Sequence, residues 1–171
     1  MSSAYERELK GILEGDQKVL SKVTNSCSPE EKENYHKILR QPFIVVRAAG
    51  SLGVDLVALR GDIAFLVEVK SSLEPTMHFS SIDGKPQRQA ESMRDGCIKT
   101  KTLPLYAYRY KGFRGDMWRL FTFDLPILDG RAQVLNRRLP KLETSKQGNY
   151  VMRWQDGLPV SEFINYLCHQ P

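Results

Sequence analysis

The sequence predicts an α/β domain in which a central, mixed five-stranded β-sheet is flanked by helices. Short runs of β-branched and other apolar residues, bounded by glycine-containing turns, are typical of strands. Longer segments in which apolar residues recur every three or four positions are typical of helices. Because both kinds of segment are interleaved along 171 residues, we expect one domain, residues 1–171, built around one sheet.

The order of the elements follows from these patterns. The first helix is expected over residues 4–14, and a second from Pro29 to about Arg40, with Ser28 as its N-cap. Residues 16–41 are therefore expected to be a helical insertion, and residues 126–158 an extended C-terminal segment. Strands are expected over residues 43–49, 54–59, 63–70, 103–110 and 118–124, a loop over 75–86, helices over 87–100 and 160–168, and a short strand over 149–154.

The net charge of +5 is unevenly distributed. Residues 85–146 carry 14 basic and 6 acidic side chains, whereas residues 1–84 carry 10 basic and 12 acidic ones. This separation suggests a polyanion-binding face near a carboxylate cluster, and the alternative is an ordinary solvated surface.

Several classes of protein are disfavoured by the sequence. No run of about 18 apolar residues is present, so we expect no membrane span. The first residues lack the apolar core of a secretion signal. Three widely spaced cysteines without a CxxC pair predict neither a disulfide framework nor a zinc site. We therefore expect a cytoplasmic protein that meets no membrane and holds no organic cofactor.

The most informative segment consists of two apolar runs that flank Gly61-Asp62. This dipeptide suits a two-residue primed turn, because glycine tolerates a positive φ. With that turn, Asp55 lies directly opposite Glu68, and Lys70 shares their face of the sheet. Both faces are otherwise largely apolar, so we expect a central hairpin in which buried charges serve a purpose.

These three charged side chains predict a metal site. Two opposed carboxylates about 5 Å apart repel each other and favour a cation between them. A hard divalent ion, Mg²⁺ with Mn²⁺ as a substitute, suits their oxygen ligands. Such a site suits phosphodiester hydrolysis, in which Lys70 orients the attacking water or offsets charge on phosphorus. The alternative is an ion network without chemistry, and we favour the metal because buried charge clusters are unusual.

A further acid is expected from the first helix, which offers Glu6 and Glu8. These two side chains point roughly 200° apart on a helix, so at most one of them can face the hairpin. The apolar spacing does not choose between them, and both stay open on these grounds.

Several motifs resemble those of the archaeal Holliday-junction resolvases, a family of the PD-(D/E)xK nuclease superfamily. The clearest likenesses lie in residues 5–9, 46–51, 54–58 and 67–70. The resemblance implies a restriction-endonuclease-like nuclease fold. It also implies a homodimer that binds a four-way DNA junction and makes paired, Mg²⁺-dependent nicks in two opposed strands.

The resemblance also assigns roles to individual residues. It implies a catalytic set of acids, a serine and a lysine: Glu6, Ser51, Asp55, Glu68 and Lys70. It implies metal ligation by three of these acids, Glu6, Asp55 and Glu68, together with the Val69 carbonyl, and so it selects Glu6 over Glu8. Contacts with DNA are expected from four basic residues: Arg7, Lys10, Arg47 and Arg88. Of these, Arg7 and Arg47 match family positions that either contact the DNA backbone or hold the site.

Two alternatives remain for the function, and each of the two added segments has two interpretations. The chain could be a nuclease of the same fold with another DNA target, such as restriction or repair, or a non-catalytic DNA-binding relative. A decayed enzyme is expected to lose Asp55, Glu68 or Lys70, and all three are present. For residues 16–41 we favour a surface helix over an arm that shapes the junction. The basic stretch 126–146 could bind DNA or be a solvated loop.

Overall fold

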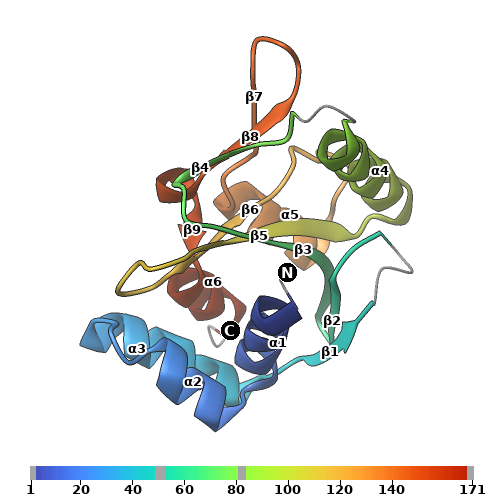
Figure 1. Ribbon diagram of the computed structural model, residues 1–171. Helices are drawn as coiled ribbons and strands as arrows, with labels where there is room; N and C mark the ends of the chain where they lie inside the picture. Colours follow the sequence, from blue (N-terminus) through green and yellow to red (C-terminus); the bar gives the residue numbers. More distant parts are fainter. Residues whose placement is uncertain (1–2, 49–52, 81–83, 169–171) are drawn as a thin grey trace.

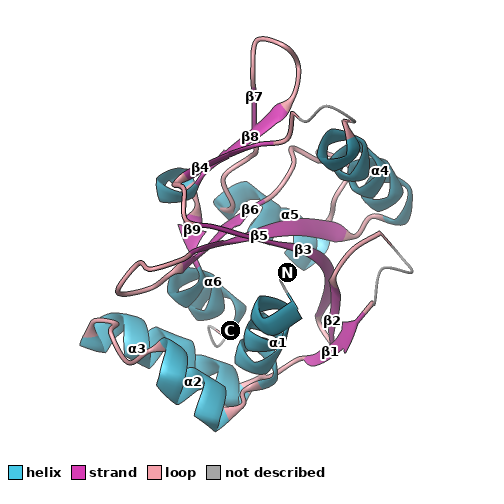
Figure 2. Cartoon of the chain, in the orientation of Figure 1, coloured by secondary structure: helices cyan, strands magenta, loops and turns pink. Residues whose placement is uncertain are grey.

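The structure is a computed structural model that describes residues 3–48, 53–80 and 84–168. Its centre is a mixed sheet in the order β1-β2-β3-β5-β6-β9 (Figure 1 and Figure 2). The strands of this sheet are β1 (Ile44–Arg47), β2 (Leu56–Arg60), β3 (Ile63–Ser72), β5 (Leu103–Tyr110), β6 (Trp118–Phe121) and β9 (Leu158–Pro159).

The predicted fold class, α/β with a mixed central sheet flanked by helices, is confirmed. The sheet has six strands rather than five, because β9 adds to the edge of β6. A strand of two residues is too short to show an alternating pattern, so β9 could not be predicted from the sequence. The parallel pairing of β3 with β5 makes the sheet mixed, since its other neighbours are antiparallel.

Helices cover both faces of the sheet. The α-helices are α1 (Ser3–Glu14), α2 (Gln17–Val23), α3 (Pro29–His36), α4 (Lys85–Thr100), α5 (Gly130–Arg138) and α6 (Val160–Leu167). Helices α1 and α6 lie on one face and α4 on the other (Figure 1). On the first face, the ring of Phe65 packs against Phe43 at 5.1 Å and against Phe163 at 5.9 Å between centroids. The core therefore joins the sheet to elements from both ends of the chain.

The β2–β3 hairpin has the predicted register but a different turn. Arg60 pairs with Ile63, and Leu56 pairs with Val67. Gly61 does not have a positive φ, so the predicted primed turn is wrong. Instead, the turn is closed by an ion pair in which Arg60 Nε lies 2.6 Å from Asp62 Oδ1. The register survives because the connection still contains two residues.

Residues 16–41 are packed into the domain. The predicted Ser28 capping box opens α3, and an additional helix, α2, begins after Asp16, whose carboxylate accepts two backbone N–H bonds. Tyr35 and Ile38 are fully buried, and the Tyr35 hydroxyl donates to Asp116 Oδ1 at 2.5 Å. This segment therefore anchors to the sheet and is more than a surface helix.

The later part of the chain contains more regular structure than expected. A second, three-stranded sheet has the order β4-β8-β7, formed by β4 (Thr76–His78), β7 (Glu143–Thr144) and β8 (Tyr150–Arg153). Thus the expected loop at 75–86 contains β4 and the start of α4, and the stretch 126–158 contains α5, β7 and β8. Among the described residues, no helix has both the length and the apolar character needed to cross a membrane.

Candidate active site

Asp55 lies at the end of the β2–β3 hairpin that is opposite its turn. Its backbone N–H donates to the Val67 carbonyl at 3.0 Å, and its Oδ2 accepts the Val69 N–H at 2.7 Å. The carboxylate therefore takes the place that a main-chain carbonyl would hold in a continuing ladder. This exchange fixes the Asp55 side chain beside β3, just beyond the last pair of the ladder, Leu56 with Val67, and Glu68 forms a side-chain hydrogen bond with it there.

Glu68 and Lys70 complete a half-buried cluster with Asp55. Lys70 Nζ lies 3.9 Å from Glu68 Oε1, and the two side chains are 23% and 13% exposed. Burial, followed by the charge of Asp55 and a hydrogen bond to it, raises the pKa of Glu68 from 4.5 to about 8. Lys70 lowers this pKa without offsetting the other effects. Without a cation, Glu68 therefore favours its protonated form at neutral pH, in which it can donate to Asp55.

The structure distinguishes Glu6 from Glu8. Glu6 accepts hydrogen bonds from Arg47 at 3.0 Å and 3.3 Å, and its charge contributes to the raised pKa of Glu68. Glu8 instead accepts from Arg109 Nε and Trp118 Nε1, both at 2.8 Å. Glu6 therefore belongs to the electrostatic surroundings of the hairpin acids, whereas Glu8 is bound to the far part of the sheet.

The donor set fits a hard divalent cation. Asp55 and Glu68 offer carboxyl oxygens in direct contact, and a hard divalent cation between them would favour the charged form of Glu68 that burial disfavours. Within the described ranges, no group of three or more His, Cys, Asp or Glu side chains is arranged as a metal site. Glu6 is occupied by Arg47, so the two hairpin acids form the centre of the candidate site.

The remaining predicted site residues have varied surroundings. Arg7 and Arg88 are exposed on α1 and α4. Lys10 pairs with Glu14 at 2.9 Å along α1. Arg47 holds Glu6, which the sequence could not show because the two residues lie 41 positions apart on different elements. Ser51 lies outside the described residues.

A pocket of about 440 Å³ lies near the end of the hairpin that carries Asp55. It lies between α4 and the hairpin, and its lining includes Val54, next to Asp55, and Leu66, which precedes Glu68 by two residues. Arg88 contributes to the same lining. A larger pocket of about 980 Å³ surrounds Arg60 at the turn, which is the opposite end of the hairpin. The smaller pocket is therefore the nearer of the two to the acids along the hairpin, although Asp55 and Glu68 do not line it.

This chain is similar to proteins of known structure. No family model matches the chain, and no curated protein matches it. The structure is similar to that of Hjc, a Holliday junction resolvase from the archaeal hyperthermophile Archaeoglobus fulgidus. The two are 20% identical, the match covers 72% of this chain and 82% of that chain, and the TM-score is 0.47.

Proposed function

We propose that this protein is a divalent-metal-dependent, structure-selective DNA endonuclease that resolves four-way junctions. The observation that carries the proposal is the contact between the Asp55 and Glu68 carboxylates with Lys70 beside them. Two adjacent, half-buried acids favour a bound cation, and a lysine next to them suits a reaction that builds negative charge. Hydrolysis of a phosphodiester is such a reaction.

In this proposal Asp55 and Glu68 hold Mg²⁺, or Mn²⁺ in its place, with Glu6 and the Val69 carbonyl as further candidate ligands. When bound, the ion would polarise the phosphate and make the attacking water more acidic. The Lys70 ammonium orients the attacking water or offsets the charge on phosphorus. The water oxygen bonds to phosphorus, the bond from phosphorus to the 3′ oxygen breaks, and that oxygen takes up a proton. The products are a 5′-phosphate and a 3′-hydroxyl.

Arg47 has a positioning role in this proposal. It forms an ion pair with Glu6 at 3.0 Å, and the side chains are 35% and 15% exposed. The pair holds an additional carboxylate close to the hairpin without leaving its charge unpaired. Ser51 and the exposed Arg7 remain candidates for contacts with the scissile strand, as do Lys10 and Arg88.

Selectivity for a junction is proposed to arise from a homodimer. Paired nicks in opposed strands require two sites, which a two-fold symmetric dimer supplies. Phosphate contacts by basic side chains then set the affinity, which falls as the salt concentration rises. We also propose that the protein is cytoplasmic, since its three cysteines are free thiols.

One nuclease assay tests the proposal. Purified protein with Mg²⁺ is offered labelled four-way junction, Y-shaped fork and linear duplex. We expect paired, symmetric nicks in the junction alone. Equal cutting of the duplex would instead indicate a nuclease with another target, and tight junction binding without cutting would indicate a non-catalytic relative.

Matched variants locate the chemistry. Asp55→Ala and Glu68→Ala are expected to abolish cutting while junction binding is retained. The control is Asp95→Ala, which removes a carboxylate of α4 that is 60% exposed, and it should cut at the wild-type rate. Wild-type cutting by either hairpin variant would show that the site is misassigned.

A further inference from the structure

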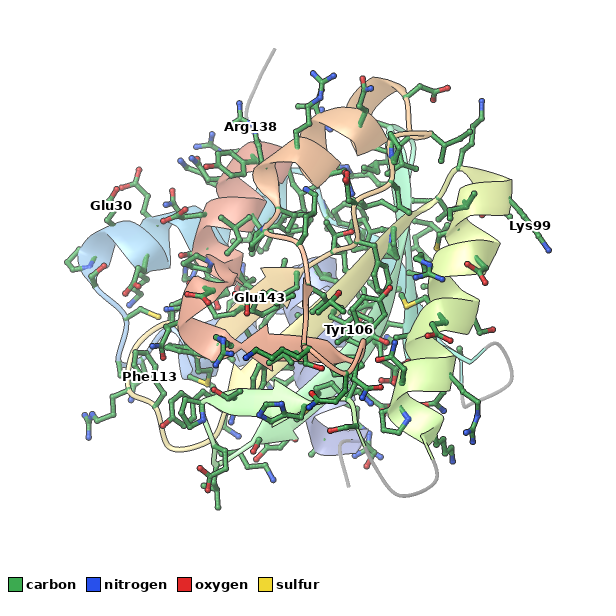
Figure 3. The ribbon with its side chains drawn as sticks, turned by 90° about the horizontal axis from the view of Figure 1, so that it is seen from above. Glu30, Lys99, Tyr106, Phe113, Arg138 and Glu143 are labelled. Carbon is green, nitrogen blue, oxygen red and sulfur yellow. The ribbon has the colours of Figure 1, made fainter. Side chains whose placement is uncertain are left out.

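The turn between β5 and β6 presents an aromatic ring within a group of basic side chains. Phe113 is 38% exposed, and its ring stacks on Tyr110 with 6.2 Å between centroids and an interplanar angle of 19°. It also contacts the Trp154 ring at 4.5 Å. Figure 3 shows Phe113 at the periphery of the molecule, whereas Tyr106 lies among the central side chains. The ring is therefore both accessible and held in place.

The backbone of the turn supports this presentation. Lys111 N–H donates to the Ser72 carbonyl at 2.9 Å, and Gly115 N–H donates to Ser26 Oγ at 2.9 Å. Gly115 has φ of +121°, and a Cβ at this position would lie 3.2 Å from the Phe113 ring. The glycine thus permits both the left-handed backbone and the close approach of the ring.

The turn follows β5, which pairs in parallel with β3, the strand that carries Glu68 and Lys70. In the β3–β5 pairing, Glu68 lies beside Tyr106, Lys70 beside Tyr108, and Ser72 beside Tyr110. Alternate residues of a strand share one face, so Tyr110 is on the face that carries Glu68. Four residues of strand separate Glu68 from Ser72, which is about 13 Å at a rise of about 3.3 Å per residue. A DNA strand bound at the hairpin acids could reach the turn.

The outward charge of the turn is positive. Lys111 and Arg114 belong to it, and Lys111 Nζ lies 5.7 Å from the centre of the Tyr5 ring, next to Glu6. The acid that follows, Asp116, is 1% exposed and accepts from the Tyr35 hydroxyl and the Ser161 N–H. A second copy of this turn would bring the same positive charges, so charge complementarity favours a polyanion over self-association.

We propose that this turn, residues 111–115, is a second DNA contact in which Phe113 stacks on an unpaired base while Lys111 and Arg114 contact the flanking phosphates. The inference rests on the proposed function and adds to it a reason for preferring branched DNA. Bases at a branch point are more easily unstacked than bases within a duplex, and stacking on an aromatic ring is tolerant of sequence.

Binding in EDTA, where no cutting is expected, tests this contact. Fluorescence anisotropy is measured with a labelled four-way junction and with a duplex of the same length. Phe113→Ala should weaken junction binding by roughly 5- to 150-fold, the range for loss of one stacked base, and should change duplex binding much less. Phe113→Trp, which keeps an aromatic ring, should bind the junction as tightly as wild type. Arg114→Ala should reduce the slope of log K against log salt by about 0.9.

The control is Ile98→Ala, which removes an apolar side chain of α4 with a matching exposure of 39%. It should leave binding unchanged. A junction with 2-aminopurine at the branch point reports stacking directly, and its fluorescence should be quenched by wild-type protein and less by Phe113→Ala.

The outcomes separate the two proposals. Unchanged junction binding by Phe113→Ala, with wild type still cutting junctions, would overturn the stacking contact alone. A lower mass in sedimentation for this variant, with unchanged DNA binding, would assign the turn to a protein contact instead. Failure of wild-type protein to bind any of these DNAs would overturn the proposed function itself.

Discussion

Replacing Glu68 with glutamine should remove a loss of stability that the metal-free wild-type protein shows as the pH rises. The pKa of Glu68 in the folded protein is about 8, against 4.5 for the unfolded chain. The folded state therefore binds the proton more tightly, so stability is highest below pH 4.5 and is lost as the pH rises towards 8. Each pH unit in this interval costs the wild-type protein about 1.4 kcal/mol relative to a group that does not titrate.

Between pH 5 and pH 7 the difference amounts to about 3 kcal/mol in the free energy of unfolding. Glu68→Gln is neutral throughout and retains a group that can donate to Asp55, so it should not show this loss. Urea denaturation at pH 5, 6 and 7 in EDTA measures both proteins. Added Mg²⁺ should restore stability to wild type and not to the variant, because the ion favours the charged carboxylate. A difference between the two proteins that does not change with pH would refute this reasoning.

Two further substitutions test contacts outside the hairpin. Glu8→Gln should lower the free energy of unfolding by about 2 kcal/mol, because it weakens charged hydrogen bonds to Arg109 and Trp118, yet junction cutting by the folded variant should persist. Loss of cutting with full stability would place Glu8 in the site in preference to Glu6. Tyr35→Phe should cost about 2 kcal/mol, since it removes the hydroxyl that donates to buried Asp116. An unchanged urea midpoint would show that residues 16–41 are not anchored through this bond.

The hairpin could be predicted because two local features agree. Its apolar runs have strand character, and a connection of two residues leaves one register, which pairs Leu56 with Val67 and so brings Asp55 close to Glu68. The predicted turn type was wrong. The sequence suggested a glycine in the left-handed region, whereas the turn has no such glycine and is closed by an Arg60–Asp62 ion pair. The register depends on the number of turn residues more than on their φ values.

Features that depend on tertiary contacts could not be predicted. The choice between Glu6 and Glu8 depends on how α1 is rotated against the sheet. Glu6 pairs with Arg47 and Glu8 with Arg109, and both arginines lie far from α1 in the sequence. The second sheet consists of strands of two to four residues, too short for a clear period. Helix α5 (Gly130–Arg138) has only Leu135 and Asn136 buried, so its apolar pattern is weak.

The central claim is that Asp55 and Glu68 hold a divalent cation. Titration of the protein with Mn²⁺, followed by the electron paramagnetic resonance signal of the free ion, measures this directly and does not depend on cutting. Wild-type protein should remove free Mn²⁺ from solution with saturation, Mg²⁺ should compete, and Asp55→Asn should lose this binding while Asp95→Asn keeps it. Binding of Mn²⁺ by Asp55→Asn with the affinity of wild type would contradict the account.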